Sequence, residues 1–473
     1  MLIAALLAAP AAQIDPPAFT IAALDPAATT TLPVPFDAAS PSQVVGSATP
    51  VGGSFAQPAL FTALGPQLLP VPPGSESGEL LGVQQDGIAV GVSFEVETFG
   101  EFLIIRDRAV RWSGGVPELL DDLTTGGAAL ELQRAVDLDS IGRILGVGRD
   151  ASIPAGRSFL WDNGLVTDLG ILPGALPTAA VRAEALNESG VVVGTGDGAT
   201  LLDHAFRWEN GVMVDLHVAS GVVGRVSSAF DVAPDGTAVG GADFTDDFID
   251  FQEPALWTPS GELVRIGTFG GSTGLARGTN AHGDVVGTAR NTTNQSRAFL
   301  YRNGVLVDLN DFLPPASGWF LLEGTAITDD GTIVGIGNLD GDLQGFRLDP
   351  TPCAGAFEVF GEPCGGDVAI AGFGCPSPGS SFVARVQQAP PSTPGVMLFG
   401  LGTVPLPIAP NCVLNVQPLI QVQVPIGSDA DGQLDFEVTL GPMAPSVDIT
   451  LQPVFVDSTF SLSAPPALVV SIP

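Results

Sequence analysis

Lysine is absent from this chain of 473 residues, and all 17 of its basic residues are arginine. With 51 acidic residues, the formal net charge is −34 at pH 7. A chain this acidic is repelled by phosphate backbones and anionic lipid headgroups, so we expect no nucleic acid as a partner. The acidic surplus is expected to keep a large surface soluble, and recruitment of divalent cations is the alternative.

Long apolar runs are also missing. Apart from the N-terminal stretch, no segment approaches the ~18 apolar residues that a membrane-spanning helix needs. No stretch places apolar residues at helical spacing, whereas 60 glycines and 41 prolines suit many tight turns between short strands. The sequence therefore predicts an all-β protein without a transmembrane segment.

Residues 1–12, MLIAALLAAPAA, form a short apolar run that ends in small residues. This is typical of a secretion signal, although the usual positively charged start is missing. We expect a short signal peptide and a secreted or cell-surface protein. The alternative is an apolar end with no targeting role.

A repeated pattern fills residues 13–349. A glycine after small apolar residues recurs every 45 to 55 residues, at Gly46, Gly91, Gly146, Gly194, Gly240, Gly287 and Gly335. A short strand pattern follows each glycine and ends at Phe61, Trp112, Trp161, Trp208, Trp257, Tyr301 and Leu348. This period and seven repeats are typical of propeller blades, so we expect a seven-bladed β-propeller.

Two details of the repeats make sharper predictions. The recurrent glycine lies inside a predicted strand, which indicates a β-bulge or a close approach of backbones near the central channel. Residues 19–24, FTIAAL, read as a final strand with no blade before it, whereas the seventh repeat lacks its last strand. We expect this N-terminal strand to complete the last blade beside Gly345–Leu348, which would remove an exposed sheet edge.

The best-kept repeat combines His204-Ala205-Phe206 with Trp208 and the strand end Val214-Asp215-Leu216. It resembles the HAF repeat of a family of bacterial extracellular proteins, and the similarity extends over about residues 19–348. The full tripeptide occurs once, and Arg157-Ser158-Phe159 stands at the matching place of another repeat. The resemblance implies a secreted or surface protein and transfers no activity to particular residues.

The four cysteines all follow Pro350, at Cys353, Cys364, Cys375 and Cys412. They are disulfide candidates with three possible connectivities, of which we favour Cys353–Cys364 with Cys375–Cys412 because near neighbours close first. A zinc site is the alternative, although no Cys-x-x-Cys spacing supports it.

The chain beyond the repeats is expected to consist of a Cys-containing linker at 350–374 and a β-sandwich at 375–473, since apolar strands alternate with Pro/Gly turns. The sandwich resembles short C-terminal domains of other large secreted bacterial proteins. That resemblance implies a role in export or surface attachment.

Candidate chemistry is sparse. The three histidines, His204, His217 and His282, fall at non-equivalent repeat positions, so we expect structural roles rather than a metal site. A Ser-His-Asp triad stays open, but no G-x-S-x-G motif occurs.

Two acidic groups stand out, namely Asp243 with Asp246, Asp247 and Asp250, and Asn338 with Asp340 and Asp342. We expect solvated loops, with calcium binding as the alternative. No catalytic, cofactor or metal residue is therefore assigned.

These observations predict a monomeric, non-catalytic secreted or cell-surface repeat protein that binds a glycan or protein partner through propeller loops. The alternative is a secreted polysaccharide hydrolase or lyase that uses carboxylates at the channel mouth. A structural surface-layer component is a third hypothesis.

Overall fold

The computed structural model describes residues 19–99, 102–123, 130–150, 153–222, 224–245, 251–314, 316–409, 412–416 and 422–473. The all-β class is confirmed, since the only helices in these ranges are α1 (Leu120–Leu123), α2 (Leu216–Ser220) and the 3-10 turn η1 (Leu309–Phe312). No helix in the described ranges is long and apolar enough to cross a membrane. The expected signal peptide at 1–12 lies outside the described residues.

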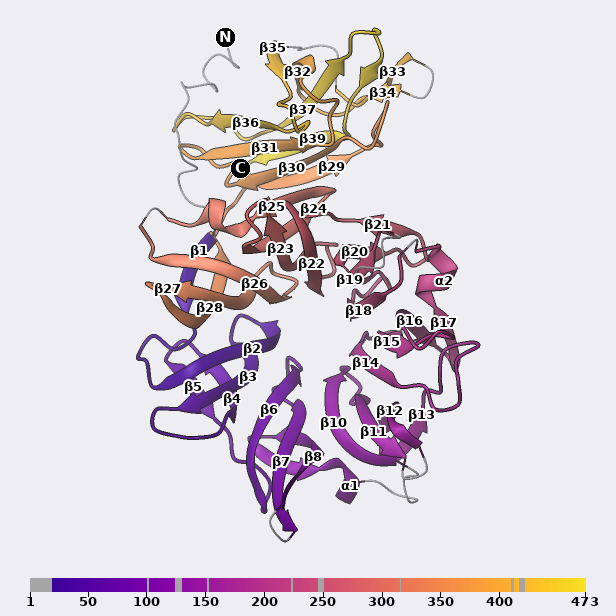
Figure 1. The fold of residues 1–473 in the computed structure, drawn as a ribbon. Coiled ribbons are helices and arrows are strands. Elements are labelled where there is room, and N and C mark those ends of the chain that lie inside the picture. Colours follow the sequence, from indigo (N-terminus) through magenta and orange to yellow (C-terminus); the bar gives the residue numbers. More distant parts are fainter. Residues whose placement is uncertain are drawn as a thin grey trace.

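Seven antiparallel sheets of four strands each surround a common centre, which makes the fold propeller-like (Figure 1). We number them I to VII along the chain. Sheets I to III comprise β2 (Thr30–Ser40), β3 (Gln43–Pro50), β4 (Gln57–Thr62) and β5 (Gly65–Leu68); β6 (Ser75–Val83), β7 (Ala89–Phe99), β8 (Phe102–Ser113) and β9 (Val116–Leu119); and β10 (Leu130–Leu138), β11 (Ile144–Asp150), β12 (Ile153–Asp162) and β13 (Leu165–Asp168). Sheets IV and V comprise β14 (Val181–Leu186), β15 (Val192–Asp197), β16 (Asp203–Glu209) and β17 (Val212–Asp215), then β18 (Ser227–Val232), β19 (Ala238–Asp243), β20 (Gln252–Trp257) and β21 (Leu263–Arg265). Sheets VI and VII comprise β22 (Gly270–Thr279), β23 (Val285–Asn291), β24 (Ser296–Arg302) and β25 (Val305–Asp308), then β26 (Trp319–Ile327), β27 (Ile333–Leu339), β28 (Asp342–Pro350) and β1 (Phe19–Ala23).

The N-terminal strand takes the place predicted for it. β1 pairs antiparallel with β28, from Phe19 opposite Pro350 to Ala23 opposite Phe346. The Leu24 N–H continues this pairing by donating to the Gly345 carbonyl oxygen at 2.9 Å. Three strands of sheet VII therefore come from the last repeat, and the fourth, β1, precedes the first repeat in the sequence.

Aromatic side chains of the third strands fill the spaces between neighbouring sheets. Phe206 of β16 is fully buried in a cluster with Leu145 of sheet III. Phe299 of β24 is fully buried with Val239 of sheet V. Burial of a phenylalanine contributes about 1.5–3 kcal/mol, so these contacts are a main source of cohesion between sheets.

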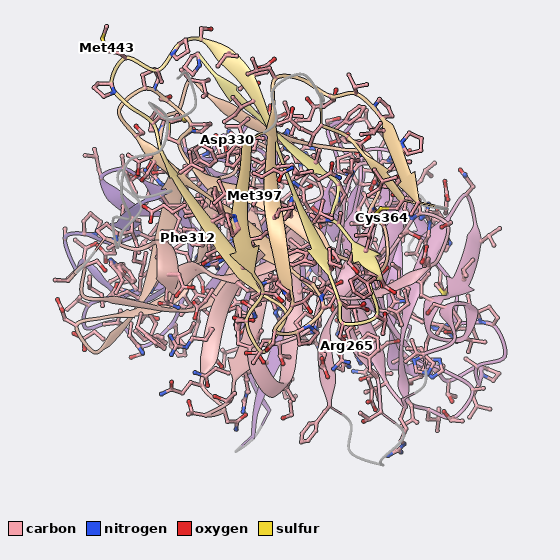
Figure 2. The ribbon with its side chains drawn as sticks, turned by 90° about the horizontal axis from the view of Figure 1, so that it is seen from above. Arg265, Phe312, Asp330, Cys364, Met397 and Met443 are labelled. Carbon is pink, nitrogen blue, oxygen red and sulfur yellow. A yellow bond between two sulfur atoms is a disulfide. The ribbon has the colours of Figure 1, made fainter. Side chains whose placement is uncertain are left out.

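Beyond Pro350, a second group of strands forms two larger sheets and a short hairpin. The strands are β29 (Ala356–Phe360), β30 (Ala369–Gly374), β31 (Ser381–Gln387), β32 (Pro394–Gly400), β33 (Leu406–Ala409), β34 (Cys412–Leu414), β35 (Val422–Gly427), β36 (Leu434–Thr439), β37 (Val447–Val456), β38 (Leu462–Ser463) and β39 (Ala467–Ile472). One sheet has the order β29-β39-β37-β32-β35 and the other β30-β31-β36, and side chains from both share one core that includes Phe382, Met397 and Leu451. Figure 2 shows this group from above, with Met397 among its strands and Met443 at its outer tip.

The stretch 350–374, which the sequence predicts as a linker, contains β29 and β30, and both strands belong to the C-terminal sheets. β29 pairs along its whole length with β39 near the end of the chain. The short apolar runs in this stretch were too brief to predict such long-range pairing.

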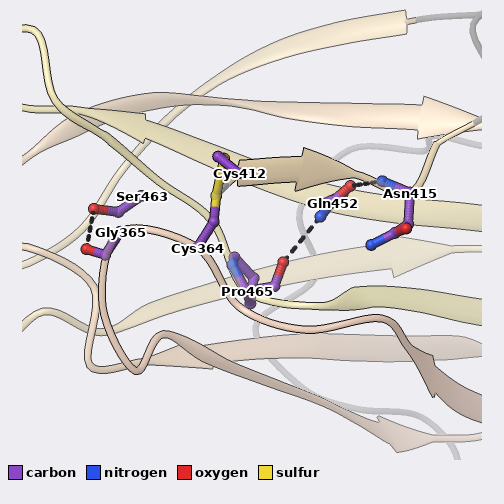
Figure 3. The surroundings of a disulfide bond; sticks show 7 residues. All are labelled: Cys364, Gly365, Cys412, Asn415, Gln452, Ser463 and Pro465. Carbon is purple, nitrogen blue, oxygen red and sulfur yellow. Dashed lines mark hydrogen bonds between the residues drawn. A yellow bond between two sulfur atoms is a disulfide. The ribbon is translucent and has the colours of Figure 1, made fainter. Parts of the chain in front are cut away.

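All four cysteines are in disulfides, but the favoured pairing is wrong. The bonds join Cys353 with Cys375 and Cys364 with Cys412. Tertiary packing explains the difference. Cys364 forms an isolated bridge with Ala464, and both residues pack in one buried cluster with Cys412 of β34. Figure 3 shows the resulting Cys364–Cys412 bond. Proximity in the folded core, rather than in the sequence, sets the connectivity.

The C-terminal strands pack against sheet VI. The side chain of Gln387 donates to the carbonyl oxygen of Leu306 at 2.7 Å and accepts from the N–H of Leu306 at 2.8 Å, so a side-chain amide pairs with the edge strand β25. Val305 and Val307 of β25 are fully buried in a cluster that includes Phe373 of β30. The contact is thus both hydrogen-bonded and apolar.

Candidate functional site

The innermost strands of the seven sheets share one irregularity. Each has a β-bulge directly after the residue that pairs with the recurrent glycine, as Ala183 pairs with Gly194 in sheet IV. The extra residues are Phe36, Leu81, Val136, Glu184, Phe230, Arg277 and Thr325. A bulge re-aims side chains and increases local twist, so these seven positions form a ring of irregular backbone.

The recurrent glycine makes this bulge possible. A Cβ added at Gly194 would overlap the carbonyl oxygen of Arg182, and equivalent overlaps occur at the other six recurrent glycines. Both predictions for this glycine, a bulge and a close backbone approach, are confirmed. Glycine is required here because any side chain would push the innermost strand away.

Six of the seven bulge residues, all but Phe230, line a cavity of about 520 Å³ at the centre of the ring. Most of its wall comes from the innermost strands of six sheets, and Val147 and Ile336 come from the second strands of sheets III and VII. Its lining comprises Val34, Phe36, Leu81, Arg134, Val136, Val147, Arg182, Ala183, Glu184, Arg277, Glu323, Thr325 and Ile336. We call it the central cavity.

Three arginines and two glutamates give the central cavity its chemistry. Arg277 bonds Glu323, with 2.7 Å between Nε and Oε1, and its guanidinium lies 4.5 Å from the centre of the Phe230 ring. The terminal amino groups of Arg277 have no hydrogen bond with a described residue. Three of the 17 arginines of a chain with net charge −34 thus meet in one cavity.

The other two arginines are also only partly engaged. Arg134 lies 3.6 Å from Glu79 and keeps a buried Nε without a hydrogen-bond partner in the described ranges. Arg182 contacts Asp203 at 3.0 Å, and both side chains are about half exposed. Guanidinium groups with free donors suit the binding of a carboxylate.

Glu184 is the carboxyl group that all three arginines act on. Burial raises its pKa above the ordinary value, and the charges of Arg182, Arg134 and Arg277 oppose that rise. Burial also raises the pKa of Glu79, against the charge of Arg134. A raised pKa favours the protonated form, which can donate a proton.

Two further cavities border the central one. Cavity A, of about 480 Å³, is lined by Arg182, Glu184, Thr195, Asp203, Ser228, Phe230, Gln252, Thr273, Gly274, Leu275, Thr288, Arg290 and Ser296. Cavity B, of about 450 Å³, is lined by Thr288, Gln295, Ser296, Phe320, Leu322, Glu323 and Ile336. Glu184 therefore lies between the central cavity and cavity A, and Glu323 between the central cavity and cavity B.

The histidines lie elsewhere. His204 and His217 stack with ring centres 3.9 Å apart, His204 contacts Asp215 at 2.9 Å, and His217 contacts Ser227 at 3.0 Å. Burial and the neighbouring His204 lower the pKa of His217 to about 4. Ser227 is fully buried and accepts the Ala205 N–H, so this group holds strands together and offers no accessible nucleophile.

The third histidine, His282, lies in the exposed turn between β22 and β23, and its backbone N–H donates to Asn280. The three histidines therefore do not converge. Among the described residues, no group of three or more His, Cys, Asp or Glu side chains is arranged to hold a metal ion.

The two acidic groups are only partly within the described residues. Asp243 is buried and accepts N–H groups of Arg225 and Thr245, whereas Asp246, Asp247 and Asp250 lie outside the described residues. Asn338 lies in β27 opposite Leu343 of β28, and Asp340 occupies the turn before β28 with a φ of 52°. Asp342 opens β28.

The arginines and glutamates of the central cavity were missed in the sequence. The available signal was their distance from the recurrent glycine. Each of them lies one residue before or after the innermost-strand residue that pairs with that glycine. Finding them required the register of the first hairpin of each repeat.

No family model matches the chain, and no curated protein matches it. Solved structures that resemble it include a Trypanosoma rangeli sialidase in complex with the inhibitor DANA, at 8% identity and a TM-score of 0.35, covering 94% of this chain and 92% of that one. The same sialidase in complex with sialic acid matches at 9% identity and a TM-score of 0.35, covering 98% and 96%. A GH32 beta-fructofuranosidase from Bombyx mori matches at 10% identity and a TM-score of 0.24, covering 97% and 96%.

The expectation of a non-catalytic binding protein is corrected here. The expectation rested on the lack of a convergent set of reactive side chains, and the central cavity contains such a set. Because the likenesses are distant, the function proposed below rests on the residues of this cavity.

Proposed function

We propose that the protein is a glycoside hydrolase that acts on a carboxylate-bearing glycan in the central cavity. The observation that carries this proposal is the meeting of Glu184, Glu323 and three arginines in one cavity of about 520 Å³. Glycoside hydrolysis requires two carboxyl groups in different protonation states on either side of the scissile bond. A cavity of this size also suits a small saccharide.

The two glutamates have environments that fit the two roles. Glu184 has a raised pKa, so it would donate a proton to the leaving glycosidic oxygen as the C–O bond breaks. Glu323 is ion-paired with Arg277 and would accept the proton of the water that adds to the anomeric carbon. Glu184 loses one proton to the leaving oxygen and Glu323 gains one from water, so the number of protons is conserved in this step.

The arginines support an acidic substrate. Arg134 and Arg277 have guanidinium N–H groups without partners among the described residues. A substrate carboxylate would accept hydrogen bonds from these groups. Charge-assisted bonds of this kind are about twice as strong as neutral ones. They would also offset the repulsion between an anionic glycan and a protein of net charge −34.

The test is the release of new reducing ends from a panel of acidic and neutral polysaccharides. Glu184→Gln and Glu323→Gln are each expected to lower the rate by about 10²–10⁴-fold, whereas the matched control Glu262→Gln, in an exposed turn, keeps it. Activity is expected to fall as pH rises through the raised pKa of Glu184. Equal activity in Glu184→Gln and the wild type would refute the assignment.

We further propose that sheets I to VII are the blades of one seven-bladed propeller and that the C-terminal sheets form a β-sandwich. Seven four-stranded sheets and the core shared by the two C-terminal sheets support these proposals. The repeats are proposed to belong to the HAF type. Two disulfides support an extracellular location.

A further inference from the structure

The central cavity does not stand alone. Arg182 and Glu184 line both it and cavity A, while Glu323 and Ile336 line both it and cavity B. The three cavities are therefore neighbours with shared wall residues, and each is large enough for a small saccharide. A site for a single terminal sugar would need the central cavity only.

Cavity A contains unused donors of the kind that a sugar chain needs. Arg290 of β23 is half-buried there, and its guanidinium has no hydrogen bond or ion pair with any residue in the described ranges. The hydroxyl groups of Thr195, Thr273 and Ser296 likewise bond none of the residues described. Because no described carboxylate pairs with Arg290, an external anion suits its guanidinium as a partner.

The positions of the arginines indicate the order in which the sugars of a bound chain would lie. Arg182 lies at the border between the central cavity and cavity A, and Arg290 lies within cavity A. Carboxylates on successive sugars would meet Arg134 and Arg277 first and Arg290 next. Glu184 stands at the border between these two positions, where a bond between two sugars would lie.

From this arrangement we infer that the three cavities together bind the interior of an acidic polysaccharide, with one charged sugar in the central cavity and the next at Arg290. This inference rests on the proposed function for the position of bond cleavage. It goes further in naming a polymer with recurring carboxylates, bound along its length rather than by its end.

The test is equilibrium binding of uronic acid oligomers of one, two, four and six units, with neutral oligomers of glucose as the comparison. The Glu184→Gln background prevents turnover and resembles the protonated carboxyl group in shape and charge. We expect the tetramer to bind at least about tenfold more tightly than the monomer, the gain of one added charged contact. Neutral oligomers are expected to bind far more weakly at every length.

Arg290→Gln is expected to remove most of the tenfold gain with length while changing monomer affinity by less than about twofold. The control Arg265→Gln removes an arginine that pairs with Glu253 at 2.6 Å in sheet V, and it should leave the length dependence unchanged. A blocking variant, Ser296→Trp, should weaken the tetramer and spare the monomer.

Equal affinity for monomer and tetramer overturns the inference, as does an Arg290→Gln variant that weakens all lengths alike or a protein that binds no acidic oligomer. The two proposals fail separately. Length-dependent binding with no release of reducing ends by the wild type would refute hydrolysis alone. Hydrolysis from chain ends with no length dependence would refute the extended site alone.

Discussion

Acid sensitivity of the ring can be predicted from one buried imidazole. His217 is 8% exposed, stacks on His204 and has a pKa of about 4. The ordinary value of 6.5 applies in the unfolded chain. Between these two values the unfolded chain binds a proton that the folded ring refuses, so stability is complete above pH 6.5 and falls as pH drops toward 4.

The magnitude follows from the shift. A difference of about 2.5 pKa units corresponds to at most ~3.4 kcal/mol. At pH 4.5 the linkage relation gives a loss of about 2–3 kcal/mol relative to pH 7.5. Other groups titrate in the same range, including carboxyl groups whose pKa is raised, so only a comparison with a variant isolates the imidazole.

His217→Asn removes the titrating ring and keeps a donor for Ser227. The variant should be less stable than the wild type at pH 7.5, and this deficit should shrink by about 2–3 kcal/mol at pH 4.5. Urea unfolding followed by tryptophan fluorescence suits the measurement, because all five tryptophans lie in sheets I to VII and none in the C-terminal sheets.

The matched control is His282→Asn, which makes the same substitution at a histidine in an exposed turn. Comparing the two variants separates the effect of the buried site from the effect of replacing a histidine by asparagine. A difference between His217→Asn and the wild type that stays flat with pH would show that burial does not penalise the imidazolium, and the reasoning would fail.

Three other perturbations test the architecture. Gly194→Ala should destabilise the ring by about 1–3 kcal/mol and weaken substrate binding, because the added Cβ overlaps the Arg182 carbonyl; denaturation and binding assays measure both. Deleting residues 19–24 exposes β28 and removes two buried side chains, so the unfolding free energy of the ring should fall by roughly 3–6 kcal/mol, with concentration-dependent association on gel filtration. Gln387→Leu should leave the backbone N–H and carbonyl of Leu306 without their side-chain partner, at a cost of about 1–3 kcal/mol. In calorimetry, the C-terminal sheets of this variant should unfold at a lower temperature, in a transition separate from that of the ring.

The repeats could be predicted from the sequence because every repeat has the same structural requirement. Each repeat needs a glycine opposite the bulge, and that need leaves the same letter at Gly46, Gly194 and the other five positions. The unpaired strand at 19–24 was predictable for a related reason, since a sheet that ends one strand short leaves an open edge.

The candidate site was not predictable in the same way. The two cavity-facing positions hold Arg182 and Glu184 in sheet IV but Val34 and Phe36 in sheet I, so no repeated motif marks them. Their chemistry arises only when the closed ring brings different sheets together. The disulfide connectivity failed for a similar reason, because it depends on pairing between strands far apart in sequence, such as β29 with β39.

Asparagine side chains join neighbouring sheets by hydrogen bonds, and a glutamine stands at the equivalent position of sheet II. Asn187 follows the innermost strand of sheet IV, and its side chain donates to the Ala233 carbonyl of sheet V at 2.9 Å. Asn280 of sheet VI makes the same bond to Thr328 of sheet VII at 3.1 Å. Both asparagines also accept N–H groups from their own turns.

Gln84 occupies the equivalent position in sheet II, since its N–H closes the same turn by donating to Ile88. It is 8% exposed, and its Nε2 has no hydrogen-bond partner among the described residues. The extra methylene of glutamine moves the amide away from the place that asparagine uses in sheets IV and VI. Gln84→Asn should therefore form the missing bond to sheet III and raise the unfolding free energy by about 1–3 kcal/mol, the cost of an unsatisfied buried donor. Gln84→Ala, which removes the amide and forms no bond, separates relief of the buried donor from formation of the bridge. If the asparagine variant is no more stable than the alanine variant, the seam between sheets II and III does not use this bridge.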